Sequence, residues 1–263
     1  MPPALPEPSR ATGAGAAPDG TGATMGPLVA ITGASGALGQ ALLRRWHTRG
    51  ARLIALSHSA TPLLVRDRLG QPIPLRQVVW RCGQEEELRP LLGELDLLVI
   101  NHGVNVHGAR DPAAAALSLE VNALSGWRLL ELFAEAAAGT VVTIPRRPEV
   151  WINTSEAEYQ PAASPLYEIS KRLLGQLISL RALDLAQNLR IRRLVLGPFR
   201  SALNPIGVLD ADWVAGEILR QADWNCNLII VTINPITYVA MPLLTALRWI
   251  YNRSFSRYPG NSE

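Results

Sequence analysis

The sequence contains few cysteine and histidine residues. Only two of its 263 residues are cysteine, Cys82 and Cys226, and they lack CxxC spacing. We therefore expect neither a disulfide framework nor a cysteine-based zinc site, and we interpret both thiols as small core side chains in a reducing, cytoplasmic compartment. The histidines lack the i, i+4 spacing of a helical metal motif, so no metal site is predicted. They are His47, His58, His102 and His107.

The sequence is also poor in charge. Charged residues make up 18% and hydrophobic residues 48%, and the formal net charge is +3. The arginines are scattered along the chain, so the mild basicity does not indicate a nucleic-acid partner. A chain of this length is expected to form a single domain with a sizeable core.

The N-terminal segment has almost nothing to bury. Residues 1–26 are rich in Pro, Ala, Gly and Thr and show no periodicity, so they are predicted to be a disordered tail. They lack the apolar central run of a secretory signal. Met25 directly precedes the first predicted strand and is a candidate alternative start.

A glycine-rich stretch follows this tail. Residues 28–31 are predicted to be a buried strand, residues 32–39 (TGASGALG) a tight turn, and residues 40–46 the opening of a helix. Such a turn exposes backbone N–H groups at a helix N-terminus, where a dinucleotide pyrophosphate can approach. A strand-to-helix turn without a ligand is the alternative, whereas a phosphate loop is excluded because Gln40 follows Gly39. The predicted cofactor contacts here are Gly33, Ser35, Gly36, Leu38 and Gly39.

The second predicted strand, residues 51–56, ends in polar residues without a carboxylate. An acidic residue at this place would bond the ribose hydroxyls of NAD, and its absence leaves room for the 2′-phosphate of NADP. Ser57, His58 and Ser59 stand there. We therefore favour NADP over NAD, with Ser57 and His58 as candidate phosphate contacts; an ordinary polar loop is the alternative.

Strands and helices alternate through the rest of the chain, which predicts an α/β fold with a Rossmann-like, doubly wound parallel sheet over residues 27–234. Either residues 140–144 or residues 149–153 form the fifth strand, and we favour the second because it delivers Thr154 and Ser155 to the carboxyl edge of the sheet. The other predicted strands are 77–81, 97–100, 193–196 and 227–233, and the predicted helices are 85–92, 111–139, 166–188 and 212–222.

An ordered set of motifs lies on these elements. It comprises TGASGALG, Asn101-His102-Gly103, Val121-Asn122-Ala123, Thr154-Ser155, YEISK (167–171) and LGPFRS (196–201). In this order, the motifs resemble those of the short-chain dehydrogenases/reductases. The chain resembles more closely the short-chain dehydrogenase part of cyanobacterial proteins described as bifunctional sterol desaturase/short-chain dehydrogenases, through NHGVNVHG, NTSEAE, SPLYEISKR and LGPF with LNPIGV and ADWVA.

This resemblance implies roles for individual residues. Tyr167 would be the general acid/base, and Lys171 would lower its pKa from about 10 and hold the nicotinamide ribose. Thr154 or Ser155 would bind the substrate oxygen, and Asn122 would hold a water connecting Lys171 to solvent. Further cofactor contacts would come from Asn101, Gly103, Pro198 and Ser201. As in the family, a homo-oligomer is expected.

The chain departs from the family pattern in four places. The glycines follow GxxGxxG, as in the extended or atypical branches of the family. Cys82-Gly83-Gln84 stands where an aspartate often contacts adenine, His102 replaces a small residue, and Gly197-Pro198 reverses the usual order.

The C-terminal extension, residues 235–263, is apolar, aromatic and then basic. Asn and Pro residues interrupt the uncharged stretch 224–247, which argues against a membrane span. Residues 238–251 are predicted to be a short helix. Peripheral membrane contact through residues 235–257 and a role as a lid or subunit contact are equally favoured, and each implies an apolar substrate.

From these observations we expect an NADP(H)-dependent oxidoreductase that interconverts a carbonyl and an alcohol on an apolar, lipid-like substrate. A non-catalytic NADP-binding sensor is one alternative. A nucleotide-sugar epimerase or dehydratase is ranked lower, because little chain remains after the last strand to build a sugar-nucleotide domain.

Overall fold

A parallel sheet forms the centre of the molecule. The computed structural model describes residues 26–139 and 147–256. Within them the strands follow the order β3-β2-β1-β4-β5-β6-β7, and every neighbouring pair is parallel. Their bounds are β1 Leu28–Thr32, β2 Arg52–Ser57, β3 Arg76–Val79, β4 Leu97–Ile100, β5 Glu149–Ser155, β6 Arg190–Leu196 and β7 Leu228–Val231. The expected doubly wound fold is confirmed, and the order reverses between β1 and β4, where such sheets bind ligands.

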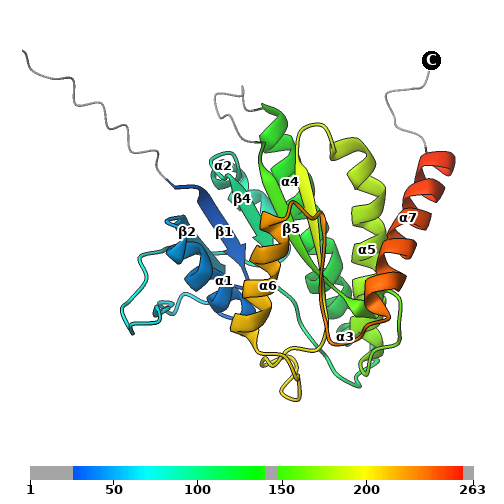
Figure 1. The fold of residues 1–263 in the computed structure, drawn as a ribbon, viewed down its shortest axis with the longest axis horizontal. Coiled ribbons are helices and arrows are strands. Elements are labelled where there is room, and N and C mark those ends of the chain that lie inside the picture. Colours follow the sequence, from blue (N-terminus) through cyan, green and yellow to red (C-terminus); the bar gives the residue numbers. More distant parts are fainter. Residues whose placement is uncertain (1–25, 140–146, 257–263) are drawn as a thin grey trace, which may run out of the picture.

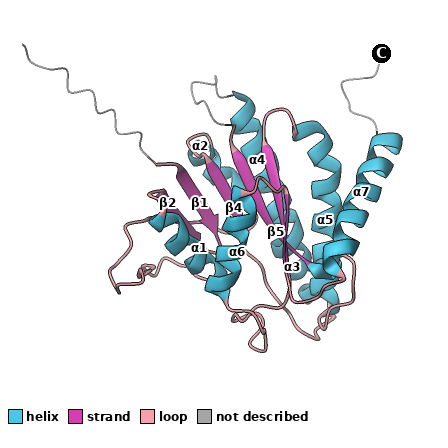
Figure 2. Cartoon of the chain, viewed as in Figure 1, coloured by secondary structure: helices cyan, strands magenta, loops and turns pink. Residues whose placement is uncertain are grey.

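Helices cover both faces of this sheet (Figures 1 and 2). One face packs against α1 and α6 through side chains that include Val29 and Ile31 of β1. The other face packs against α2, α4 and α5 through a second core that includes Ala30, and α7 lies on the outer side beside α5. The helices are α1 Ala37–Thr48, α2 Arg89–Leu92, α3 Pro112–Leu119, α4 Ser125–Gly139, α5 Pro165–Leu185, α6 Ala211–Asp223 and α7 Thr237–Phe255.

The helical stretch expected over residues 111–139 is confirmed, except that one turn in its middle is π-helical. It begins as the sequence indicates, because Asp111 caps α3 by accepting a hydrogen bond from the backbone of Ala114 at 3.0 Å. A π-helical turn, Glu120–Leu124, then separates α3 from α4. The turn places Asn122 where its side chain bonds a neighbouring loop, and this tertiary contact leaves no trace in the hydrophobic periodicity.

Other boundaries also shift. The helix expected over residues 85–92 is a 3₁₀ turn, Glu85–Leu88, followed by the single turn of α2. The side chain of Glu85 accepts hydrogen bonds from the backbone of Gly83 and from Ser125, which fixes the turn before α2. Residues 140–144, the rejected fifth strand, lie outside the described residues, as do residues 1–25 of the predicted tail.

Candidate active site

The glycine-rich turn joins β1 to α1 at the carboxyl edge of the sheet. Gly33 has a φ of +60°, and a Cβ atom there would lie 2.9 Å from the Cα atom of His102. A Cβ atom on Gly39 would lie 2.3 Å from the carbonyl oxygen of Gly33. Both positions therefore require glycine for the turn, α1 and the β4 loop to meet.

The N-terminus of α1 fits a dinucleotide pyrophosphate. Gly36, its N-cap residue, is exposed and has no side-chain cap, and the first turn contains no acidic residue. The first backbone N–H groups of α1 lack partners within the helix and lie at the positive end of its dipole. Ser35 is exposed beside them, whereas Leu38 is buried and can offer only its backbone.

At the end of β2 the candidate phosphate contacts differ in their surroundings. Ser57 is buried, and its hydroxyl donates to the carbonyl of Ser59 at 3.0 Å and accepts from Gln77 Nε2 at 3.0 Å. The hydroxyl of Ser57 thus has partners within the loop, and its contact with the cofactor stays a prediction. His58 is exposed and remains available.

Thr32, the last residue of β1, holds the loop that follows β4. Its hydroxyl accepts hydrogen bonds from the backbone N–H groups of Asn101 at 2.8 Å and His102 at 3.2 Å. The amide oxygen of Asn101 accepts from Asn153 Nδ2 at 2.9 Å, so the loop is also tied to β5. These hydrogen bonds fix the position of the β4 loop beside the end of β1, and the sequence did not single out Thr32.

His102 points inward from the same loop. Its ring lies edge-on to Trp80, with centroids 5.2 Å apart, and its Nδ1 lies 2.9 Å from Thr32 Oγ1. Burial, reinforced by the charge of Lys171, lowers the pKa of His102 to about 4. The imidazole is therefore neutral at physiological pH. A neutral ring can be buried at this position, where the family usually has a small residue.

The side chain of Asn122 fixes the loop that follows β4. Its Oδ1 accepts from the backbone N–H of Val104 at 2.7 Å, and its Nδ2 donates to the carbonyl of Val104 at 2.9 Å and to Ser170 Oγ at 3.0 Å. Both N–H bonds of the amide are thereby used. The expectation that Asn122 holds a water stays a prediction; in this structure its donors bond the loop beside Gly103 and Ser170.

The structure distinguishes between the two hydroxyls that end β5. Thr154 is buried, and its hydroxyl donates to the carbonyl of Leu194 at 3.2 Å on β6. The next side chain along a strand points to the opposite face. There, the hydroxyl of Ser155 acts on the phenol of Tyr167 from α5 by lowering its pKa. The arrangement therefore favours Ser155 over Thr154 as the predicted substrate anchor.

The phenol of Tyr167 differs electrostatically from expectation. Burial raises its pKa above the usual value, and the Ser155 hydroxyl only partly offsets this. Lys171 is not among the groups that shift the pKa of Tyr167 in this structure, so its expected acidification of the phenol stays a prediction. Lys171 Nζ lies 5.7 Å from the centre of the tyrosine ring and donates to the carbonyl of Asn153 at 3.1 Å.

Lys171 is the only lysine of the chain, although lysine and arginine together number 25. It is buried, and burial lowers its pKa to about 8, against the opposing effect of Glu158. An arginine at this position would keep its charge at any physiological pH, whereas this ammonium can lose its proton near neutrality. The sequence count alone could have signalled this position.

A buried ion-pair network lies beside Lys171. Glu158, in the 3₁₀ turn after β5, has a fully buried side chain that accepts a hydrogen bond from Arg248 of α7 and lies 3.6 Å from Arg193 of β6. A Cβ atom on Gly175 of α5 would collide with this carboxylate at 1.8 Å. Sequence reasoning missed the network, because its members lie far apart in the chain and only the fold brings them together.

The loop after β6 completes this edge. Pro198 is exposed, and the hydroxyl of Ser201 accepts from the backbone N–H of Asn204 at 3.2 Å. The loop therefore presents its backbone near the ends of β5 and β6.

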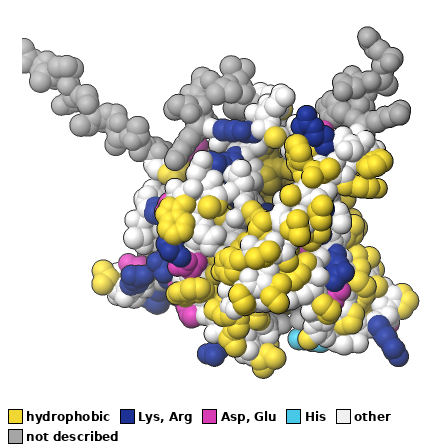
Figure 3. Space-filling model, turned by 45° about the vertical axis from the view of Figure 1, so that its right-hand side comes forward, with side chains coloured by type: hydrophobic (Ala, Val, Ile, Leu, Met, Phe, Trp, Pro, Cys, Tyr) yellow, Lys and Arg dark blue, Asp and Glu magenta, His cyan; other side chains and the backbone are white. Residues whose placement is uncertain are grey.

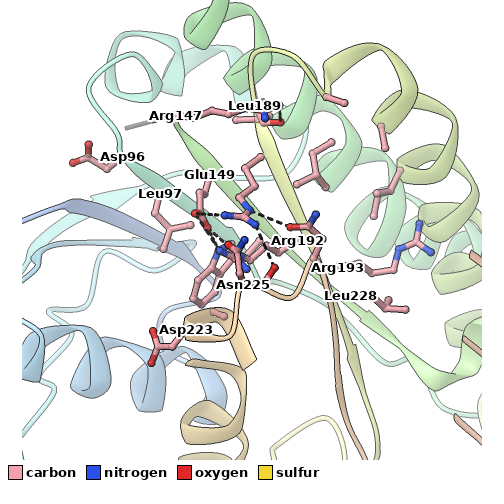
Figure 4. Close-up of a pocket in the computed structure, with 18 of the residues that line it drawn as sticks. Asp96, Leu97, Arg147, Glu149, Leu189, Arg192, Arg193, Asp223, Asn225 and Leu228 are labelled. Carbon is pink, nitrogen blue, oxygen red and sulfur yellow. Dashed lines mark hydrogen bonds and ion pairs between the residues drawn. The ribbon is translucent and has the colours of Figure 1, made fainter. Parts of the chain in front are cut away.

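A cavity of about 1070 Å³ lies at the opposite, amino edge of the sheet (Figure 4). Two ion pairs lie in its lining: Arg192 with Glu149 at 2.7 Å and Arg49 with Asp223 at 2.6 Å. Arg192 also donates to the backbone of Cys226. These pairs connect strands and helices, and Ser155 and Tyr167 do not line the cavity.

Comparison with known proteins agrees with this geometry. The model of the NAD dependent epimerase/dehydratase family matches residues 29–194. A protein from Synechocystis sp. named monoglucosyldiacylglycerol epimerase is 47% identical over 234 residues. The match covers 88% of this chain and 55% of that protein, so the chain spans about half the length of its relative.

Solved structures share the fold. An alcohol dehydrogenase from Comamonas testosteroni, described as specific for bulky-bulky ketones, matches with a TM-score of 0.69 and 16% identity, covering 91% of this chain and 98% of that one. A short-chain dehydrogenase from Burkholderia cenocepacia, in complex with NADP, matches with a TM-score of 0.67 and 18% identity, covering 88% and 98%. From its fold, its ordered motifs and the family match, the chain belongs to the NAD-dependent epimerase/dehydratase family of short-chain dehydrogenase/reductase-like proteins.

Proposed function

We propose that this chain is a nicotinamide-dependent epimerase that inverts one hydroxyl-bearing carbon in the sugar head group of a glycolipid. The observation that supports it most directly is the 47% identity to the monoglucosyldiacylglycerol epimerase. That identity extends over the region containing Ser155, Tyr167 and Lys171, which lie together at the carboxyl edge of the sheet. The activity of the longer relative is a proposal for this chain.

The reaction consists of two half-reactions at the same carbon, an oxidation followed by a reduction. When bound, the nicotinamide cofactor would supply reversible hydride transfer, so that the carbon would be oxidised to a ketone and then reduced on the opposite face. Tyr167 removes the hydroxyl proton as the hydride leaves and returns a proton to the same oxygen as the hydride comes back. Ser155 donates a hydrogen bond to that oxygen and orients it toward the phenol. The proton and the hydride are both restored, so no net oxidation occurs.

Lys171 supplies positive charge beside the phenol. Without a ligand, burial holds the pKa of Tyr167 above its usual value, so the phenol keeps its proton at neutral pH and is poised as an acid. Its function as a base requires added positive charge nearby. The ammonium of Lys171 and the cationic ring of an oxidised nicotinamide can both provide such charge.

NADP is the cofactor form that we assign to the chain. The end of β2 carries no carboxylate to repel a 2′-phosphate, and His58 is exposed there. The structural relative from Burkholderia cenocepacia is in complex with NADP.

Net oxidation or reduction of an apolar alcohol or ketone, ranked first from the sequence, uses the same half-reaction. It differs only in releasing the ketone instead of reducing it again. The named relative favours epimerisation over this outcome. A glycolipid agrees with the lipid-like substrate that the C-terminal extension indicated. An enzyme for such a substrate also requires no domain that binds a sugar nucleotide.

The proposal can be tested by product analysis. The chain, loaded with NADP, is incubated with monoglucosyldiacylglycerol in detergent micelles, and the head-group sugar is released and identified. We expect an epimeric hexose without a net change in nicotinamide absorbance, and no product from Tyr167→Phe. Steady consumption of cofactor with accumulation of a ketone would favour net oxidation instead. Tight NADP binding without any conversion would favour the sensor.

A further inference from the structure

The polarity of α7 is inverted relative to that of an ordinary surface helix. Its buried face carries polar residues: Thr237, Arg248 and Asn252 accompany Met241. Its outer face carries an apolar stripe at helical spacing, with side chains that are 55–70% exposed. This stripe, the α7 face, consists of Ile236, Val239, Leu243, Leu247 and Ile250.

The inner contacts show that this orientation is specified. Met241 packs on Val195 and Ile230 of β6 and β7, and Arg248 donates to the buried Glu158. The hydroxyl of Thr237 lies 2.9 Å from Tyr159 Oη. Turning the helix to bury its apolar stripe would break these contacts and leave Glu158 without Arg248, which is strongly unfavourable for a buried charge.

The exposed apolar surface extends beyond the stripe. Trp249, Tyr251 and Phe255 are also 48–75% exposed, and Figure 3 shows hydrophobic side chains gathered on the side of the molecule that it turns forward. Contiguous apolar patches of this kind mark interaction surfaces. The α7 face therefore requires an apolar partner.

We propose that the α7 face docks on a lipid surface and lies in the plane of the interface. The choice of a lipid rests on the proposed function, since a glycolipid substrate is held in a bilayer. The helix sequence contains no acidic residue, and the guanidinium of Arg253 lies 5.1 Å from the ring centre of Trp249. Apolar, tryptophan and arginine side chains without acidic ones are the composition of interfacial helices that bind anionic membranes.

The helix lies on the surface and does not cross it. No helix among the described residues is long and apolar enough to span a bilayer. In α7, Arg248 and Asn252 face the protein and Pro242 interrupts the backbone hydrogen bonding. Only the apolar face of α7 is available to lipid, and it occupies one side of the helix.

Docking would bring the catalytic edge to the head groups. The α7 face begins at Ile236, next to Thr237, whose hydroxyl donates to Glu156 at 3.1 Å. Glu156 directly follows Ser155 in the chain. A surface that receives α7 therefore lies near the carboxyl edge of the sheet, where a sugar projecting from the bilayer can reach Tyr167.

The test is cosedimentation with vesicles, using the full chain with Tyr167→Phe so that binding is measured without turnover. The vesicles are phosphatidylcholine alone, or phosphatidylcholine mixed with anionic phosphatidylglycerol. The pair Leu243→Ser/Leu247→Ser is compared with Leu64→Ser/Leu69→Ser, which removes two leucines of similar or greater exposure between β2 and β3. Thermal unfolding is recorded for each protein to verify that it is folded.

We expect binding to both vesicles, stronger to the anionic ones, and at least a tenfold loss of affinity in the α7 pair but not in the control pair. Protein that stays in the supernatant with both vesicles would overturn the proposal. So would light scattering that shows a dimer converted to a monomer by the α7 pair, since the face would then be a contact between copies. Turnover of detergent-dispersed substrate is measured separately, so failure of docking and failure of the proposed function remain distinguishable.

Discussion

At the scale of single residues, the site depends on a phenol that is hard to ionise. Burial raises the pKa of Tyr167, and the hydroxyl of Ser155 is the group that counteracts this. Lys171 adds a titratable charge nearby. The proposed chemistry therefore depends on how Ser155 and Lys171 set the pKa of the Tyr167 phenol.

Removing the Ser155 hydroxyl should raise the pKa of the phenol further. We expect Ser155→Ala to lower kcat by roughly a hundredfold, the lower end of the range for acid-base groups, and to shift the alkaline rise of the rate to higher pH. Thr154→Val is the matched control, because its hydroxyl is bonded to Leu194 on the other side of the strand. Equal losses in both variants, without a shift in the pH profile, would contradict the role of Ser155.

The pKa of Lys171 can be measured directly, because a single lysine gives a single side-chain resonance in a lysine-labelled sample. We expect a pKa of about 8 rather than 10.5, since the ammonium is buried. Glu158→Gln should lower the pKa further by removing the negative charge that supports the ammonium. A value near 10.5 would show that the ammonium is hydrated.

The same shift has a consequence for stability. Between pH 8 and 10.5 the unfolded chain binds a proton at this lysine that the folded chain does not. The contribution of Lys171 to the free energy of unfolding therefore increases as pH rises through this window. At neutral pH the folded chain keeps Lys171 protonated, so the full free-energy cost of burying its charge is present.

Sequence reasoning placed the candidate residues on their elements better than it predicted their hydrogen-bond partners. The spacing of Tyr167 and Lys171 placed them on one face of a helix, which α5 confirms. The choice between Thr154 and Ser155 depended on strand register, and the roles of Asn122 and Ser57 depended on partners in other loops. Such tertiary hydrogen bonds cannot be read from local patterns.

At the scale of elements, the turn between β1 and α1 contains one glycine, Gly36, that the fold does not require but that we expect to matter for cofactor binding. A Cβ atom on Gly36 would meet only the carbonyl of Gly33, at 3.3 Å, and its φ of −73° suits any residue. The methyl group would instead enter the space above the N-terminus of α1. This position therefore allows the binding surface to be altered with little effect on the helix.

We expect Gly36→Ala to weaken NADP binding at least tenfold while it lowers the free energy of unfolding by less than about 1 kcal/mol. Calorimetric titration and thermal unfolding measure the two effects. Gly93→Ala is the control, since a Cβ atom there meets nothing within 4 Å. Unchanged NADP affinity in Gly36→Ala would show that the cofactor lies elsewhere.

Element boundaries followed the sequence where local signals decide them. Asp111 and Pro112 start α3 as expected, because a capping carboxylate and a proline act within one turn. The π-helical turn around Asn122 was missed, because the apolar pattern continues through it. The inverted polarity of α7 was also hidden, since the sequence does not show that Glu158 draws Arg248 inward.

At the scale of the whole molecule, the strand order places the ends of β2, β1 and β4 side by side at one edge of the sheet, where folds of this class bind dinucleotides. Ligand binding to the folded state raises its apparent stability, by about 2.7 kcal/mol at a hundredfold excess over Kd. We therefore expect NADP to raise Tm more than NAD does at equal concentration.

His58→Asp should reverse this preference, since a carboxylate at the end of β2 repels the 2′-phosphate and can bond the ribose hydroxyls. His107→Asp, an exposed histidine outside β2, is the control. A larger Tm increase with NAD than with NADP in the unaltered chain would contradict the assignment of NADP.

The most direct test of epimerisation follows the hydrogen on the reacting carbon. Monoglucosyldiacylglycerol with deuterium on every ring carbon of its glucose is supplied to the NADP-loaded chain, and the epimeric product is analysed by mass spectrometry. If one hydride is removed and returned within a single binding event, the product retains all its deuterium and gains none from the solvent. Loss of one deuterium to the solvent, or its appearance in released cofactor together with a keto sugar, would contradict the proposed function.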